Sequence, residues 1–211
     1  MQATPGASLN TSDPSHPTGE SARSARHDRC LLLLAAVALS GYAVDLTTKV
    51  LAVDRLTEGS PVRVVGDWLR LDLIRNPGAA FSTGTSYTVV LTLVAVAAAV
   101  GVLWTARRLA SIGWSLGLGF LLAGVLGNLT DRIFRAPGFA EGHVVDFLRL
   151  PHWPVFNVAD ICINVAAVLI VVQALRGVGV DGTRAETDGR RPRRPRRHTP
   201  PAGAGGHGEP R

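Results

Sequence analysis

Four long runs without a charged side chain restrict the possible folds of this chain more than any other feature of its sequence. They cover residues 30–44, 87–106, 109–130 and 161–175. The two middle runs are twenty and twenty-two residues long, which is enough for a helix to cross a bilayer. The two outer runs reach that length when the first is extended to Val53 and the last back to Phe156. The sequence therefore predicts an all-α membrane protein with four transmembrane helices.

The segments on either side of these runs have a different composition. Residues 1–29 are rich in Ser, Thr, Pro and Ala, and residues 176–211 carry nine arginines against four acidic residues. Such segments lack the apolar side chains that a folded core needs. We therefore expect disordered tails around one domain formed by residues 30–175. The basic tail contains no aromatic residue, so we expect it to contact anionic membrane lipid and not nucleic acid.

The arginines also indicate how the helices are oriented. Only a short turn around Arg107 and Arg108 separates the two middle runs, so those helices form an antiparallel hairpin. This turn and both basic tails fall on one side of the bilayer, and basic flanks favour the cytoplasmic side. Both termini are therefore placed in the cytoplasm. On the opposite side, apolar and charged residues alternate at 62–65 and 69–74, which predicts a small extracytoplasmic sheet.

Polar side chains gather at the extracytoplasmic end of the predicted bundle, where four alternating spans bring one end of each helix together. A charged residue in a membrane span is costly and usually has a partner or a function. This gathering of polar residues therefore predicts a functional site. Its members are Asp45, Lys49, Asn76, Asn128, Asp131, Arg132, Asn157, Asp160 and Asn164.

Two carboxylates near this end suggest a specific chemistry. Asp146 lies in an apolar stretch, which would raise its pKa if it were unpaired, and Asp160 opens the last apolar run. Two neighbouring carboxyl groups can share one proton and activate a water molecule, as in aspartic proteases. The residues therefore suggest a catalytic dyad in a small membrane peptidase.

Structural roles for the same residues stay open at this point. Asp45 and Lys49 are four residues apart and could form an ion pair along one helix face. Asn157 could cap the last helix, with Asp160 as its partner in the first turn.

Two other classes of site also stay open. His143 and His152 lie near Asp146 and suggest zinc, but the chain lacks a His-Glu-x-x-His motif or a Cys/His cluster, so no metal or cofactor is expected. The charged helix ends could instead form an ion relay in a small transporter, or belong to a membrane scaffold. Against a transporter, the charges concentrate at one surface and no inverted repeat is visible.

Five short blocks, in order along the chain, resemble the lipoprotein signal peptidases (signal peptidase II). The resemblance covers about residues 30–175 and implies a four-helix membrane aspartic endopeptidase with an extracytoplasmic sheet and a loop helix. It implies Asp146 and Asp160 as the catalytic pair. The blocks are Asp45 with Lys49, Asn-Pro-Gly-Ala-Ala-Phe-Ser at 76–82, Gly-Asn-Leu-Thr-Asp-Arg at 127–132, Val-Val-Asp-Phe at 144–147 and Phe-Asn-Val-Ala-Asp at 156–160.

The resemblance also implies a substrate and a set of supporting residues. Such enzymes cut diacylglyceryl-modified prolipoproteins on the N-terminal side of the lipid-modified cysteine and release the signal peptide. No cofactor is implied, and a monomer is expected. The residues expected to bind substrate or support the site are Asp45, Lys49, Asn76, Gly78, Asn128, Asp131, Arg132, Asn157 and Ala159.

Overall fold

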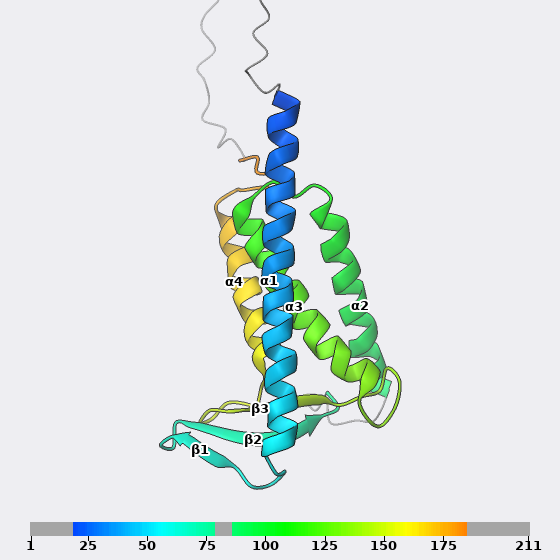
Figure 1. Ribbon diagram of the computed structural model, residues 1–211, viewed down its shortest axis with the longest axis vertical. Helices are drawn as coiled ribbons and strands as arrows, with labels where there is room; N and C mark the ends of the chain where they lie inside the picture. Colours follow the sequence, from blue (N-terminus) through cyan, green and yellow to red (C-terminus); the bar gives the residue numbers. More distant parts are fainter. Residues whose placement is uncertain (1–18, 79–85, 185–211) are drawn as a thin grey trace, which may run out of the picture.

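Four long helices and a small sheet make up the structure, a computed structural model that describes residues 19–78 and 86–184 (Figure 1). All four helices are long and apolar enough to cross a membrane, as the sequence predicts. In chain order the elements are α1 (Gly19–Arg55), β1 (Val62–Val65), β2 (Leu69–Asn76), α2 (Ser86–Ala106), α3 (Ile112–Phe134), β3 (Val144–Arg149) and α4 (Val158–Leu175).

Parts of both expected tails belong to the folded structure. α1 begins at Gly19, before the first apolar run, and its His27 Nδ1 donates to the Leu109 carbonyl at 2.8 Å. Residues 176–184 fold back against the turn between α2 and α3, where the Ala110 N–H donates to the Val180 carbonyl at 2.9 Å. Backbone and side-chain hydrogen bonds that composition does not reveal hold these segments in place. The rest of each expected tail lies outside the described residues.

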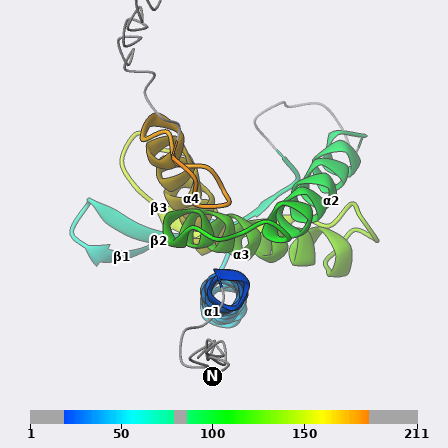
Figure 2. The same cartoon turned by 90° about the horizontal axis from the view of Figure 1, so that it is seen from above.

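The third helix is the centre of the bundle. α3 packs against α1, α2 and α4, and the view along the bundle shows it between the other three (Figure 2). Small residues allow the close approach: a Cβ added at Gly119 would lie 2.9 Å from the Val37 Cβ of α1. A Cβ at Gly127 would lie 2.3 Å from the Asp45 carboxylate. α1 therefore packs closely on α3 up to the end where the polar residues gather.

The sheet lies across one end of the bundle, beyond the start of α4, and the last turns of α1 reach it (Figure 1). Its strands run in the order β1-β2-β3, and both pairs are antiparallel. The first two strands match the predicted segments, while β3 comes from the α3–α4 connection and was not predicted as a strand. In the β2–β3 register Ile74 pairs with Asp146 and Asn76 pairs with Val144, so Asn76 and Asp146 become diagonal neighbours.

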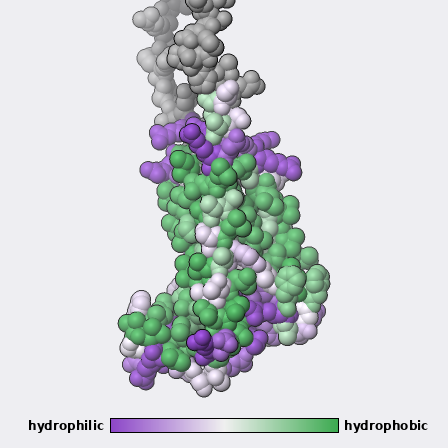
Figure 3. Space-filling model, in the orientation of Figure 1, coloured by the Kyte–Doolittle hydropathy of each residue, from purple (hydrophilic) through white to green (hydrophobic). Residues whose placement is uncertain are grey.

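The outer surface of the helices is largely apolar between two hydrophilic ends (Figure 3). Exposed tryptophans mark both ends, with Trp104 at the end of α2 and with Trp68 and Trp153 near the sheet. This distribution is typical of membrane interfaces. The expected loop helix is not among the elements of the described residues, and residues 79–85, which hold the second half of the Asn-Pro-Gly block, lie outside them.

Candidate active site

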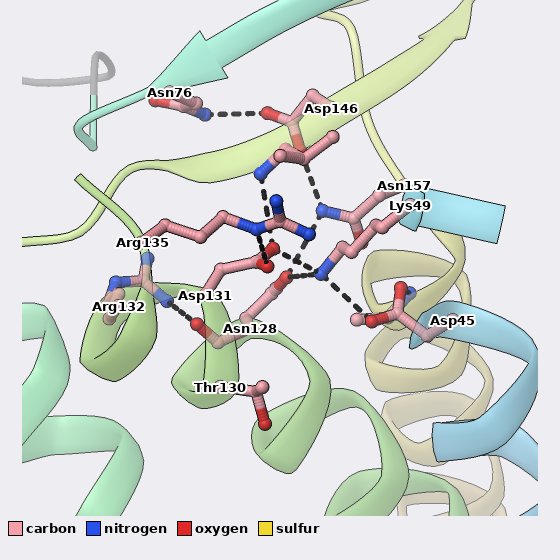
Figure 4. A network of polar contacts seen from close by, with 12 residues as sticks. Asp45, Lys49, Asn76, Asn128, Thr130, Asp131, Arg132, Arg135, Asp146 and Asn157 are labelled. Atoms are coloured by element: carbon pink, nitrogen blue, oxygen red, sulfur yellow. Dashed lines mark hydrogen bonds and ion pairs between the residues drawn. The ribbon is translucent and has the colours of Figure 1, made fainter. Parts of the chain in front are cut away.

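A network of polar side chains fills the space between the helix ends and β3 (Figure 4). Its members come from α1, β2, α3, β3 and the start of α4, so residues far apart in the sequence meet here. Nearly all residues expected from the sequence take part in it. They separate into two groups, which differ in how the charge of their carboxylates is balanced.

Lys49 is the centre of the first group. Its Nζ lies 2.9 Å from Asp45 Oδ2 and 2.9 Å from Asp131 Oδ2, and it donates to Asn128 Oδ1 at 2.9 Å. These three contacts use all three donors of the ammonium group. The side chain is 0% exposed, so no water replaces a lost partner. The expected ion pair between Asp45 and Lys49 is present, but it is buried inside the bundle and not on a helix surface.

Both carboxylates that contact Lys49 also accept a hydrogen bond from the backbone of another element. Asp45 Oδ1 accepts from the Ala159 N–H at 2.8 Å and so ties α1 to the first turn of α4. Asp131 forms an ion pair with Arg135 and accepts from the Val145 N–H of β3 at 3.2 Å. The two acids are therefore balanced by two cations, and their oxygens have structural partners.

Asp146 belongs to the second group and carries no ion pair among the described residues. It is 3% exposed, and its two oxygens accept from Asn76 Nδ2 at 2.8 Å and Asn157 Nδ2 at 2.6 Å. The Asn76 amide is oriented by its other end, because Asn76 Oδ1 accepts from the Gly78 N–H at 2.8 Å. Burial raises the pKa of Asp146 to about 6, and the charge of Asp160 contributes in the same direction against the two asparagine donors.

Asp160 lies at the first turn of α4 and is only half buried. It forms a capping box with Asn157: the Asn157 N–H donates to Asp160 Oδ2 at 3.1 Å, and the Asp160 N–H donates to Asn157 Oδ1 at 3.0 Å. Asn128 Nδ2 donates to the remaining oxygen at 3.0 Å. The capping role expected as an alternative is therefore present. A carboxylate at this position is also favoured by the helix dipole.

Asn157 joins the two uncompensated carboxylates. Its backbone and carbonyl oxygen contact Asp160, while its Nδ2 donates to Asp146 and, at 3.1 Å, to Asn128 Oδ1. It is 0% exposed, so its orientation is fixed by these bonds. One asparagine therefore contacts both carboxyl groups, one from β3 and one from α4, and neither carboxyl group forms an ion pair among the described residues.

Two arginines lie at the end of α3: Arg132 is in its last turn, and Arg135 is its C-cap. Arg132 Nη1 donates to the Asn128 carbonyl at 3.3 Å, and its guanidinium interacts electrostatically with Asp160, Asp131 and Asp146. Sequence reasoning missed Arg135, although its spacing of four from Asp131 is that of a helical ion pair. The described residues contain no group of three or more His, Cys, Asp or Glu side chains arranged to hold a metal ion.

Comparison with known proteins gives a consistent result. The model of the family described as signal peptidase (SPase) II matches residues 37–176, which include every residue of the network. A protein named lipoprotein signal peptidase from Mycobacterium avium (strain 104) is 50% identical over 177 residues, which cover 83% of this chain and 97% of the relative. One of the same name from Rhodococcus jostii (strain RHA1) is 54% identical over 160 residues, covering 75% of this chain and 79% of the relative.

Solved structures share the fold. One, described as a bacterial membrane enzyme, is similar with a TM-score of 0.61 and 23% identity, over 67% of this chain and 91% of the other. A second bacterial membrane enzyme structure gives a TM-score of 0.57 and 23% identity, over 66% and 85% of the two chains. The four-helix arrangement with its sheet therefore occurs in structures of known membrane enzymes.

Proposed function

Because this chain belongs to the signal peptidase II family of membrane proteases, which remove signal peptides from prolipoproteins, we propose that Asp146 and Asp160 are its catalytic pair. The observation that carries the proposal is the division of the four carboxylates. Asp45 and Asp131 are balanced by Lys49 and Arg135, whereas the other two are bridged by asparagine and have no ion pair among the described residues.

The environments of the two aspartates suggest different starting states. Asp146 is buried in a setting that keeps the proton to a higher pH, so it is suited to begin as the acid. Asp160 is half buried at a helix N-terminus, where a negative charge is stabilised, so it is suited to begin as the base. A pair of carboxyl groups whose pKa values differ in this way can hold one proton between them below about pH 6.

The proposed reaction uses this single proton. Asp160 removes a proton from a water molecule as the water oxygen attacks the scissile carbonyl carbon, and Asp146 gives its proton to the carbonyl oxygen. A neutral diol forms. Asp160 then returns its proton to the amide nitrogen as the carbon–nitrogen bond breaks, and Asp146 recovers a proton from the diol hydroxyl. Both carboxyl groups end in their starting states, and one water is consumed.

The supporting residues would then act through the pair. Asn76 and Asn157 direct donors at Asp146 and so fix its carboxyl plane, while Asn128 orients Asp160. We propose that Arg132, which lies near both charges, binds a carbonyl or ester oxygen of the substrate. The remaining residues fix the positions of α1, β2, α3 and α4 around the pair through their ion pairs and hydrogen bonds. They are Lys49, Asp45, Asp131, Gly78 and Ala159.

We propose diacylglyceryl-modified prolipoproteins as the substrates and cleavage on the N-terminal side of the modified cysteine. The acyl chains would lie in the bilayer against the exposed apolar faces of the helices. With both termini in the cytoplasm, the network opens at the extracytoplasmic surface, where the lipid-modified cysteine of an exported precursor would be. We propose that the enzyme acts as a monomer.

The test is cleavage of a diacylated lipobox peptide by the full chain in detergent micelles. Asp146→Asn and Asp160→Asn should each lose at least about 1,000-fold in kcat, because neither amide can carry the proton. Asp54→Asn is the matched control, since Asp54 is exposed, pairs with Arg55 and lies at the same end of the bundle. A chelator should leave the rate unchanged. An Asp146→Asn enzyme that turns over at near the normal rate would remove the basis of the proposal.

A further inference from the structure

The ion pairs of the described residues all lie at the end of the bundle that carries the sheet. The opposite end is different: among the side chains described in residues 21–78 and 88–184, none of its seven arginines forms an ion pair with a carboxylate. A hydrophilic band crosses the visible face of the bundle there (Figure 3). An unbalanced set of cations of this kind attracts an anionic partner. The arginines are Arg23, Arg26, Arg29, Arg107, Arg108, Arg176 and Arg184.

Three of these arginines converge on one cavity of about 270 Å³. Arg26 comes from α1, Arg176 follows the last residue of α4, and Arg184 comes from the segment that folds back on the bundle. Among the described residues, no carboxylate lines the cavity. The segment is held by the hydrogen bond from the Ala110 N–H to the Val180 carbonyl and by the β-bridge between Val178 and Arg184, so α1 and the two ends of this segment each bring one arginine to the cavity.

The wall between the arginines includes two buried polar side chains. Ser111 and Gln173 line the cavity, are 6% and 9% exposed, and contact one another with Gln173 Nε2 at 3.4 Å from Ser111 Oγ. Ser111 is also the N-cap of α3, and its side chain caps no N–H of the first turn. Ile112 and Gly113 of that turn line the cavity as well. The uncapped helix N-terminus adds a partial positive charge and backbone donors to those of the arginines.

The rim of the cavity continues onto apolar surface. Ile112 is 65% exposed, and Leu175, which directly precedes Arg176, is 83% exposed. On α4, Val172 and Val168 precede Arg176 at intervals of four residues and are 40% and 64% exposed, so they continue the apolar surface away from the cavity. A soluble anion would use only the polar part of this site. An amphiphile would use both parts, with its head among the arginines and its chains along the membrane-facing side of α4.

We propose that this cavity binds the phosphate group of an anionic phospholipid, with the acyl chains of the lipid lying against α4. The arginines and the N-terminus of α3 supply donors to the phosphate oxygens, and guanidinium groups are well matched to that geometry. The site is at the opposite end of the bundle from the aspartate pair, so it is independent of the catalytic proposal.

The experiment measures lipid binding to the full chain by native mass spectrometry from detergent. The probes are phosphatidylglycerol, phosphatidylcholine and inorganic phosphate. Arg26→Gln/Arg176→Gln/Arg184→Gln should weaken phosphatidylglycerol binding by about fivefold per arginine, on the order of 100-fold in all. The wild-type chain should prefer phosphatidylglycerol over phosphatidylcholine, and this preference should disappear in the variant.

The control variant is Arg23→Gln/Arg107→Gln/Arg108→Gln, which removes the same charge from the same end of the bundle without touching the cavity. It should lose less than about tenfold, because only the screened field of distant charges changes. Equal losses in the two triple variants would refute a built site and leave only diffuse attraction. Displacement of phosphatidylglycerol by inorganic phosphate at equal affinity would refute the part played by the acyl chains. If the first variant does not purify as a folded protein, Arg184→Gln against Arg108→Gln gives the same comparison.

Discussion

Removing the ammonium group at the centre of the buried network should strongly destabilise the fold. Lys49→Met deletes three contacts of 2.9 Å and leaves Asp45 with one donor, the Ala159 N–H, among the described residues. The network then carries an extra negative charge in a place that water does not reach. Breaking a buried pair from one side typically costs about 3–5 kcal/mol. We expect a loss in this range for Lys49→Met.

The double variant Asp45→Asn/Lys49→Met separates lost charge balance from lost hydrogen bonds. It restores neutrality, so its loss should fall to about 1–3 kcal/mol, the range for unsatisfied buried polar groups. Arg55→Met is the surface control, because the Arg55–Asp54 pair is exposed on both sides and such pairs contribute about 0–1 kcal/mol.

Unfolding in mixed micelles, titrated with sodium dodecyl sulfate and followed by the fluorescence of the four tryptophans, measures these free energies. The double variant should be more stable than the single variant by about 2 kcal/mol. A Lys49→Met protein that is as stable as Arg55→Met would refute the reasoning, since it would mean that the buried carboxylate needs no cation.

Four further predictions follow from the site and the bundle. The rate of cleavage should fall as pH rises through about 6, where Asp146 loses its proton. Asn76→Ala should move this fall to higher pH, because the Asn76 amide donor lowers the pKa of Asp146. A fall at unchanged pH in this variant would contradict the assignment of Asp146 as the acid. Because the pKa of Asp146 is raised on folding, its protonated form adds to the free energy of unfolding fully below about pH 3.8, and this contribution is lost as pH rises through about 6. A free energy of unfolding that shows no such decline would argue against a buried acid. Gly127→Ala should lower the free energy of unfolding in micelles by about 1–3 kcal/mol, because the new methyl group meets the Asp45 carboxylate of α1. Gly101→Ala, where a Cβ has nothing within 4 Å, should leave the stability unchanged or raise it. Equal effects of the two changes would contradict the close approach of α1 to α3. Asn157→Ala should lose about 0.5–2 kcal/mol of stability with the cap and at least about 100-fold in kcat, and a variant with lowered stability but normal kcat would limit the residue to capping.

The spans and the first two strands follow from the sequence because each depends on a local pattern. An uncharged run long enough to cross a bilayer has few alternatives, and the alternation at 62–65 and 69–74 has a period of two. β3 gave a weaker signal. Its residues Val144–Arg149 are mostly buried on both faces, so the apolar and polar residues do not alternate cleanly. A strand of this kind cannot be distinguished from other buried segments by periodicity.

The members of the network could be expected from the sequence, but the bonds between them could not. Alternating spans place the polar helix ends on one side of the bilayer, which is enough to group them. Which acid faces Lys49 depends on how α1 rotates against α3, and that rotation is set by tertiary packing at positions such as Gly119 and Gly127. For the same reason the sequence did not reveal the link from Asn157 to Asp146, or the part of Arg135 in balancing Asp131.

The order of the elements along the chain has a consequence for synthesis of the protein. Asp146 and Asp160 both follow α3, and the strand that carries Asp146 is held by β2, which precedes α2. A nascent chain that has inserted only its first three helices therefore has neither carboxyl group in place. If the proposed pair is catalytic, proteolytic capacity arises only after α4 has entered the bilayer and β3 has paired with β2, so incomplete translation products would not cleave other membrane proteins.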